Sequence, residues 1–144
     1  MRDLKTLTIF FRTRGTLEGL IKRDIASYGL NITEFGTLDA LYHKGPLTVN
    51  AILEKVLVAN SSMSYVLEAL GKKGLITRTR NPDDKRSYLI ALTDKGKDTF
   101  ECMYETHRKN MRAHLDVLDD HEEKELQRLL KKIGKQNEGE IHYE

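Results

Sequence analysis

The feature of this 144-residue chain that most restricts its fold is a hairpin-like segment enclosed between two helix signals. Residues 75–80 and 87–92 form two short runs rich in β-branched and aliphatic side chains, a composition typical of strands. The sequence Asn-Pro-Asp at 81–83 lies between them and favours a tight turn. Gly74 is suited to end a preceding helix, and Thr93 is suited to begin a following one. We therefore predict a small β-hairpin inserted into a mainly helical chain.

Helical periodicity of the apolar residues predicts most of the remaining structure. Asn31 with Glu34 has the pattern of a capping box. Thr48 is suited to cap the helix after it, and Asp119 with Glu122 repeats the capping-box pattern. Two short helices, a turn, a third helix and a hairpin make a winged helix-turn-helix, so the predicted fold class is mainly α with a small β-hairpin wing (α+β). The expected helices span about residues 4–28, 31–44, 49–57, 60–73, 93–118 and 119–137.

The expected organisation is a single domain over residues 1–144, because this length suffices for one core but not for two independent ones. Residues 30–96 would form the winged helix-turn-helix region, and residues 138–144 a flexible tail. The flanking helices, within 1–28 and 97–137, carry more apolar surface than so small a winged domain covers. Burying each large side chain is worth roughly 1.5–3 kcal/mol, so we expect a second chain to cover this surface in a homodimer. The side chains concerned are Leu4, Leu7, Phe11, Met111, Leu115, Leu118, Leu126, Leu129 and Ile133.

Composition excludes several functional classes. No apolar run approaches the roughly 18 residues that a membrane span needs, and the N-terminus is too short and too charged for a secretory signal. The single cysteine, Cys102, excludes an intrachain disulfide and fits a reducing compartment. We therefore expect a cytoplasmic protein without a membrane partner. The sequence contains no glycine-rich phosphate loop, paired acid/base carboxylates or Ser-His-Asp pattern, so we expect neither an enzyme nor a cofactor.

The net charge of +2 conceals an uneven distribution of charge. Residues 72–86 hold six basic side chains against two acidic ones, whereas residues 115–144 hold nine acidic against five basic. A concentrated positive potential is what a phosphate-binding surface requires, although charges on an exposed strand edge also serve merely to prevent aggregation. The basic residues are Lys72, Lys73, Arg78, Arg80, Lys85 and Arg86.

The helix before the hairpin has two different faces. Ala59, Met63, Val66, Leu67 and Leu70 recur at the spacing of one apolar face. Short polar side chains on the other face allow a helix to enter the major groove, which is only about 12 Å wide, and to bond base edges or phosphates. A plain solvent-exposed face would look the same, but an arginine-bearing hairpin follows directly. The candidate DNA-binding residues on this helix are Asn60, Ser61, Ser62, Ser64 and Tyr65.

Three segments together resemble the MarR family of bacterial winged-helix transcriptional regulators: "SSMSYVLEAL" at 61–70, "LEALGKKGLITR" at 67–78 and "DDKRSYLIALTDKG" at 83–96. The D-x-R pattern at 84–86, followed by L-T-x-x-G, is the most specific match, and the outer helices extend the likeness over nearly the whole chain. The chain departs from the family at Ala59, where a serine or threonine usually caps the recognition helix; Asn60 is the alternative cap. A base preference is therefore not transferable.

The resemblance implies a homodimer that grips a pseudo-palindromic DNA operator, as a repressor by family default. The recognition helix would enter the major groove, and Arg86 the adjacent minor groove, where negative potential is enhanced. Asp84 would hold Arg86 or a neighbouring arginine in place. A small-molecule or oxidative signal would release the DNA.

The sequence offers two candidate sites for such a signal. An effector pocket between the DNA-binding and dimerisation regions would use Phe10, Phe11, Tyr42, His43 and Tyr65, although aromatic residues at helical spacing are more often core. Cys102 is a candidate redox sensor, or a small core residue of the long helix.

A metal site is not expected. Some family members bind zinc through histidines on the long helix, where His107 and His114 share a face. The i, i+4 partner of His107 is Met111, which is not a zinc ligand.

Two other functions fit a winged helix. One is a protein-interaction adaptor that makes no DNA contact, for which clustered arginines are unnecessary. The other is a nonspecific DNA-binding protein, which would show no sequence preference.

Overall fold

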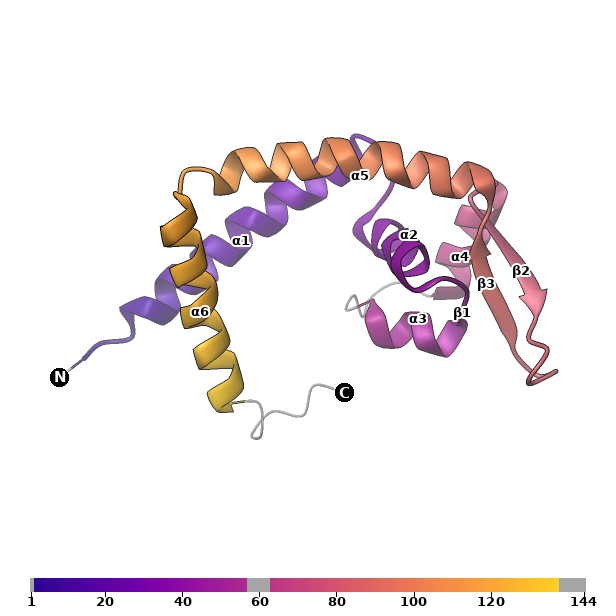
Figure 1. Ribbon diagram of the computed structural model, residues 1–144, viewed down its shortest axis with the longest axis horizontal. Coiled ribbons are helices and arrows are strands. Elements are labelled where there is room, and N and C mark those ends of the chain that lie inside the picture. The colour runs from indigo at the N-terminus through magenta and orange to yellow at the C-terminus, as the bar shows by residue number, and fades with distance from the viewer. Residues whose placement is uncertain (1, 57–62, 138–144) are drawn as a thin grey trace. The chain divides into compact units, whose positions relative to one another are not determined.

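The computed structural model describes residues 2–56 and 63–137. Two compact units, 1–107 and 108–144, divide the chain within the long helix α5. In these residues the elements are α1 (Lys5–Ala26), α2 (Ile32–Lys44), β1 (Leu47–Thr48), α3 (Val49–Lys55), α4 (Met63–Lys72), β2 (Ile76–Arg80), β3 (Tyr88–Leu92), α5 (Asp94–Leu115) and α6 (Asp120–Asn137) (Figure 1). The predicted fold class is confirmed. The predicted start of the recognition helix and the predicted tail at 138–144 lie outside the described residues.

The helix starts follow the predicted caps. The Asn31 side chain accepts a hydrogen bond from the Glu34 backbone N–H at 2.8 Å, and the Glu34 carboxylate accepts one from the Asn31 N–H at 3.0 Å. The Thr48 hydroxyl accepts from the Ala51 N–H at the start of α3. Each bond satisfies an N–H group that helix geometry leaves without a partner.

The sheet has one strand more than the predicted hairpin. Its order is β1-β3-β2, and both pairs are antiparallel (Figure 1). β1 has only two residues, of which Leu47 pairs with Ile90. A segment so short shows no alternation in the sequence, so its pairing with β3 was not predictable from local pattern. β1 attaches the hairpin to the helix-turn-helix at the start of α3.

The core of the first unit is built around α2, α4 and the sheet. Met63, Val66, Leu67 and Leu70 are buried along one face of α4, as the sequence predicted. The other members of the core include Ile25 of α1, Leu38 and Leu41 of α2, Ile52 of α3, Ile76 and Ile90 of the sheet, and Phe100 and Met103 of α5.

The junction between hairpin and α5 explains the L-T-x-x-G pattern. The Thr93 hydroxyl donates to the Gly74 carbonyl at 2.6 Å and accepts from the Gly96 N–H at 2.9 Å. A Cβ atom at Gly96 would lie 1.9 Å from the carbonyl oxygen of Leu75, so only glycine fits there without a backbone shift. Thr93 thus caps α5, as predicted, and ties it to the end of α4.

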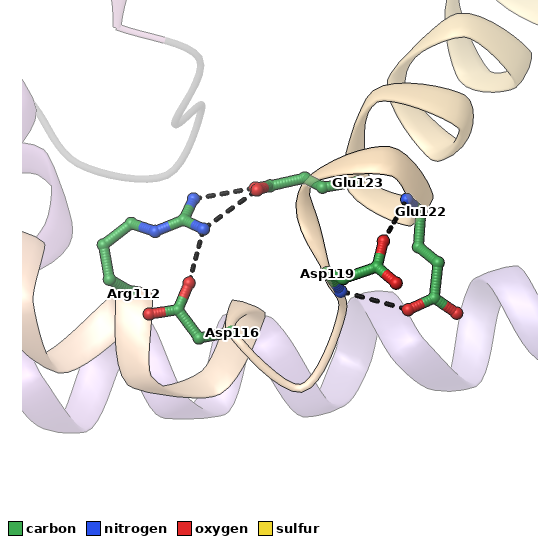
Figure 2. Close-up of polar contacts among 5 residues, drawn as sticks. All are labelled: Arg112, Asp116, Asp119, Glu122 and Glu123. Atoms are coloured by element: carbon green, nitrogen blue, oxygen red, sulfur yellow. Dashed lines mark hydrogen bonds and ion pairs between the residues drawn. The ribbon is translucent and has the colours of Figure 1, made fainter.

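The second unit contains the end of α5 and all of α6. Asp119 and Glu122 form the predicted capping box at the start of α6 (Figure 2). Arg112 donates to Asp116 at 2.6 Å and to both carboxylate oxygens of Glu123, at 2.7 and 2.9 Å (Figure 2). These hydrogen bonds raise the pKa of the Arg112 guanidinium, and the hydrogen bond from Arg112 lowers the pKa of the Glu123 carboxyl.

Each unit leaves an apolar stripe exposed. On α1 and just before it, Leu4, Leu7, Ile9, Phe10 and Phe11 are exposed, although Ile25 at the other end of the helix is buried. On α6, Leu126, Leu129, Leu130 and Ile133 are exposed, and no residue is buried. Among the described helices, none is both long and apolar enough to cross a membrane.

Candidate nucleic-acid interface

The face of α4 opposite the core is exposed. Ser64, Tyr65 and Glu68 lie on it, and the Tyr65 side chain is 72% exposed. The Tyr65 ring is therefore accessible to a partner. The other predicted contacts of this helix, Asn60, Ser61 and Ser62, lie outside the described residues, as does its predicted cap.

The two lysines at the end of α4 differ in their surroundings. Lys72 is exposed and pairs with Glu68 one turn back at 3.3 Å. The Lys73 ammonium instead donates to the Gly29 carbonyl at 3.1 Å and to the Glu34 carboxylate at 3.2 Å. Glu34 is buried, so Lys73 compensates a carboxylate that is largely shielded from water. The sequence identified Glu34 as a capping residue but not its ion pair, because Lys73 lies 39 residues away.

The arginines of β2 share one face of the hairpin. Arg80 pairs with Tyr88 and Arg78 with Ile90 across the two strands. Directly paired residues point to the same face of a sheet, as do residues two apart in a strand. Both arginines therefore continue the face on which Ile90 meets the core, and both are exposed.

A groove separates α4 from β2. A cavity of about 420 Å³ lies there, lined on the α4 side by Ser64, Glu68 and Gly71, and on the β2 side by Thr77 and Arg78. The structure thus brings the predicted residues Ser64 and Arg78 to the same groove, although they are far apart in the sequence.

Hydrogen bonds between side chains and backbone N–H groups of the same loop hold the hairpin tip. The Asn81 side chain accepts from the Asp83 N–H, and the Asp84 carboxylate accepts from the Arg86 N–H, both at 3.0 Å. Within the described chain, Asp84 makes no ion pair with Arg86, Arg78 or Arg80. Asp84 thus holds Arg86 through its backbone N–H, and the role of Asp84 in DNA binding stays a prediction. Asp84 shapes the loop and leaves the guanidinium of Arg86, like the ammonium of Lys85, exposed to solvent.

The predicted effector residues occupy separate surroundings. Phe10 and Phe11 contact each other edge to face, with ring centroids 5.7 Å apart. Tyr42 and His43 belong to a different aromatic cluster, which includes Phe100 and Tyr104. The Tyr42 hydroxyl donates to Glu101 at 2.9 Å, and this bond raises the pKa of Tyr42. His43 lines a cavity of about 330 Å³ between α2 and α3.

Cys102 and two histidines of α5 were candidates for a redox or metal site. Cys102 is exposed on α5, so within one chain it is not a core residue. The ring nitrogen Nδ1 of His107 lies 2.7 Å from the Asp24 carboxylate, which also accepts from the Tyr28 hydroxyl. His114 is exposed. In residues 2–56 and 63–137, no group of three or more potential ligands is placed to hold a metal ion.

Comparison with known proteins identifies the family to which the chain belongs. The model of the MarR family matches residues 30–88, the region that contains α2 to the start of β3. Over 133 residues the chain is 30% identical to the HTH-type transcriptional regulator MhqR of Bacillus subtilis (strain 168), a match that covers 92% of each protein. The chain belongs to the MarR family. It is accordingly a DNA-binding transcriptional regulator and not an enzyme.

Solved structures support the same fold. A MarR-like transcription regulator from Bacillus cereus ATCC 10987 superimposes with a TM-score of 0.80 at 21% identity, over 93% of this chain and 99% of that one. A mutant MarR from E. coli, solved in complex with operator DNA, superimposes with a TM-score of 0.76 at 21% identity, over 90% and 94%. The winged helix-turn-helix is thus the fold of this MarR-family chain.

Proposed function

We propose that this MarR-family regulator is a cytoplasmic repressor that binds a pseudo-palindromic operator as a homodimer. The observation that carries the proposal is the arrangement of the first unit. The exposed face of α4 lies across a groove from Arg78, and the exposed tip of the hairpin carries Arg86. α4 would read the major groove, while Arg86 would enter the adjacent minor groove.

The exposed apolar stripes support the dimer. Leaving the large side chains of α1 and α6 in water would cost more than the few kcal/mol by which a domain is usually stable, since each is worth roughly 1.5–3 kcal/mol when buried. A second copy covers both stripes through a two-fold axis, which also places two recognition helices about one helical turn of DNA apart. Symmetry of the protein would then account for symmetry of the operator.

The proposed DNA contacts divide into those that recognise bases and those that bind phosphates. Ser64 and Tyr65, with the predicted contacts at 60–62, would select the sequence, whereas Lys72, Arg78, Arg80 and Lys85 would hold phosphates. Lys73 would contribute less than the sequence indicates, because its ammonium already has two partners within the protein. Asp84 would act through the loop that presents Arg86.

Release would follow a small-molecule or oxidative signal. The exposed thiol of Cys102 is accessible to an oxidant in a single chain, and the aromatic side chains near Tyr42 and His43 are the proposed place for a small apolar effector, with Phe10, Phe11 and Tyr65 as further candidates.

Selection of bound duplexes from random DNA tests the proposal directly. We expect recovery of one sequence with two-fold symmetry and half-sites about one helical turn apart. Light scattering of the free protein at micromolar concentration should give the mass of a dimer. Recovery of unrelated sequences would indicate a nonspecific DNA-binding protein, and a folded monomer would refute the palindromic operator.

Arg86→Ala tests the wing. We expect a loss of roughly 1–3 kcal/mol of operator affinity and a decrease of about one unit in the salt slope. The fold should persist, because the tip contributes no buried side chain to the core. Unchanged affinity in a folded variant would contradict the minor-groove role. For comparison, Lys85→Ala removes a proposed phosphate contact from the same loop and should weaken binding to all sequences alike.

A further inference from the structure

One aromatic side chain of the hairpin, Tyr88, faces both arginines of β2. The Arg78 guanidinium carbon lies 5.4 Å from the centre of the Tyr88 ring, and that of Arg80 lies 5.8 Å from it. Both distances are within the roughly 6 Å over which a cation is attracted to the face of an aromatic ring. Tyr88 is 40% exposed, so its ring covers little of the core and remains available to these two neighbours.

The strand register explains why one ring serves two arginines. Arg80 is directly opposite Tyr88, and Arg78 is the diagonal neighbour two residues along β2 on the same face. Diagonal neighbours in an antiparallel pair lie about 7–8 Å apart at the backbone, which long side chains span. The Arg80 guanidinium also donates to the Lys85 carbonyl at 3.4 Å, so Tyr88 is the partner that the two mutually repelling arginines share.

We propose that Tyr88 is a positioning residue for DNA binding, whose ring holds the guanidinium groups of Arg78 and Arg80 on the hairpin face that borders the groove beside α4. The partner of the two guanidinium groups is the phosphate backbone of duplex DNA, and in this respect the inference rests on the proposed function. An arginine side chain that is ordered before binding loses less conformational entropy when it meets a phosphate. Tyr88 itself need not touch the DNA.

Substitution of Tyr88 separates the ring from its hydroxyl. Tyr88→Leu removes the π face but keeps an apolar side chain in the strand, whereas Tyr88→Phe keeps the ring. We expect Tyr88→Leu to weaken binding to the duplex recovered by selection roughly four- to twenty-five-fold, two contacts of about two- to fivefold each, and Tyr88→Phe to bind like the unmodified protein. Equal losses in both variants would show that the hydroxyl matters and would overturn the positioning role.

Combining Tyr88→Leu with substitution of the two arginines distinguishes positioning from a direct contact of Tyr88 with DNA. Tyr88→Leu removes no charge, so we expect weaker binding with an unchanged slope of log affinity against log salt concentration. The double variant Arg78→Ala/Arg80→Ala should lower that slope by roughly two units. When Tyr88→Leu is added to this double variant, we expect no further loss. If Tyr88→Leu lowers the affinity of the double variant as much as it lowers that of the unmodified protein, the proposal is overturned.

Nuclear magnetic resonance of the free protein tests the same geometry without DNA. The ring current of Tyr88 should shift the side-chain resonances of Arg78 and Arg80, and Tyr88→Leu should remove these shifts while the backbone resonances of α4 stay in place. If the shifts are present but the protein binds no duplex, the proposed function fails and the ring geometry stands. If the protein binds DNA but the shifts are absent, the positioning role alone is refuted.

Discussion

α4 and α6 are both amphipathic helices with an ion pair near one end, but they differ in what covers them. The apolar face of α4 is buried within its own chain, where Leu70 is 0% exposed. The apolar face of α6 remains in water, where Ile133 is 56% exposed. Lys73, next to the end of α4, pairs with a buried carboxylate, whereas Arg112 pairs with Glu123 at the surface near the start of α6.

The difference teaches that an apolar stripe predicts the need for a partner but not its source. Helical periodicity alone gives α4 and α6 the same description. In α4 the partners are α2 and the sheet of the same unit, and the helix presents its other face to the proposed DNA. For α6, we propose that the partner is another copy of the chain. The following predictions test this distinction, beginning with the largest expected effect.

The double substitution Leu126→Glu/Leu130→Glu tests the partner of α6. These residues are one helical turn apart on the exposed apolar face, so two buried charges would oppose the dimer. We expect loss of the dimer and a loss of operator affinity of more than roughly a hundredfold, because two large side chains contribute about 3–6 kcal/mol when buried. Light scattering and DNA binding measure both effects.

The control for this variant lies on another face of α6. Gln127→Glu/Lys131→Gln has the same spacing and lowers the net charge by the same amount, so it should leave the dimer intact. If the dimer is as stable in Leu126→Glu/Leu130→Glu as in this control, then α6 does not pack against a second copy of the chain.

Leu70→Ala and Leu130→Ala compare the two helices directly. Leu70→Ala leaves a cavity in the core and should lower the free energy of unfolding by about 2–5 kcal/mol at any protein concentration. Leu130→Ala should instead raise the dissociation constant of the dimer, because the lost contacts lie between chains. Chemical denaturation measures the first effect, and light scattering over a dilution series measures the second. An unchanged dissociation constant in Leu130→Ala would place the partner of Leu130 within one chain.

Lys73→Ala and Lys72→Ala compare a buried partner with an exposed one. Without Lys73, the buried carboxylate of Glu34 loses its ammonium, and we expect a loss of about 1–2 kcal/mol of folding stability, discounted because the lysine is partly exposed. Lys72→Ala breaks only a surface pair and should change stability by less than about 0.5 kcal/mol. DNA affinity should respond in the opposite order. Equal effects on stability would argue against the structural role of Lys73.

Glu123→Gln tests the surface pair at the start of α6 and should have the smallest effect. Its pKa is lowered in the folded protein by the hydrogen bond from Arg112, so the pair stabilises the fold above the ordinary glutamate value of 4.5. This contribution is lost as the pH falls from that value through the lowered pKa, because the carboxylate is protonated. The midpoint of thermal unfolding should therefore differ between the two proteins at neutral pH and converge in acid, once the pH falls below the lowered pKa. A difference that persists in acid would indicate a contribution other than the ion pair.

Local signals in the sequence determined the elements of this protein. The capping boxes, Thr48, Thr93 and the turn at 81–83 each act over about three residues, and the structure confirms them within one or two residues of the predicted ends. The buried face of α4 also followed from spacing, because a core position repeats with the helical turn. The exposed arginines followed from their charge.

Tertiary structure decided the contacts between residues that are far apart in the chain. The pairing of β1 with β3, the ion pair between Lys73 and Glu34 over 39 residues, and the contact of His107 with Asp24 over 83 residues leave no local pattern. The same holds for Tyr88, whose place beneath two arginines depends on strand register. Spacing along one element specifies which side chains share a face, but only packing specifies what that face meets. For this reason the sequence did not show that Lys73 pairs with a buried carboxylate or that Asp84 holds Arg86 through its backbone N–H, and the DNA contacts expected of both residues stay predictions.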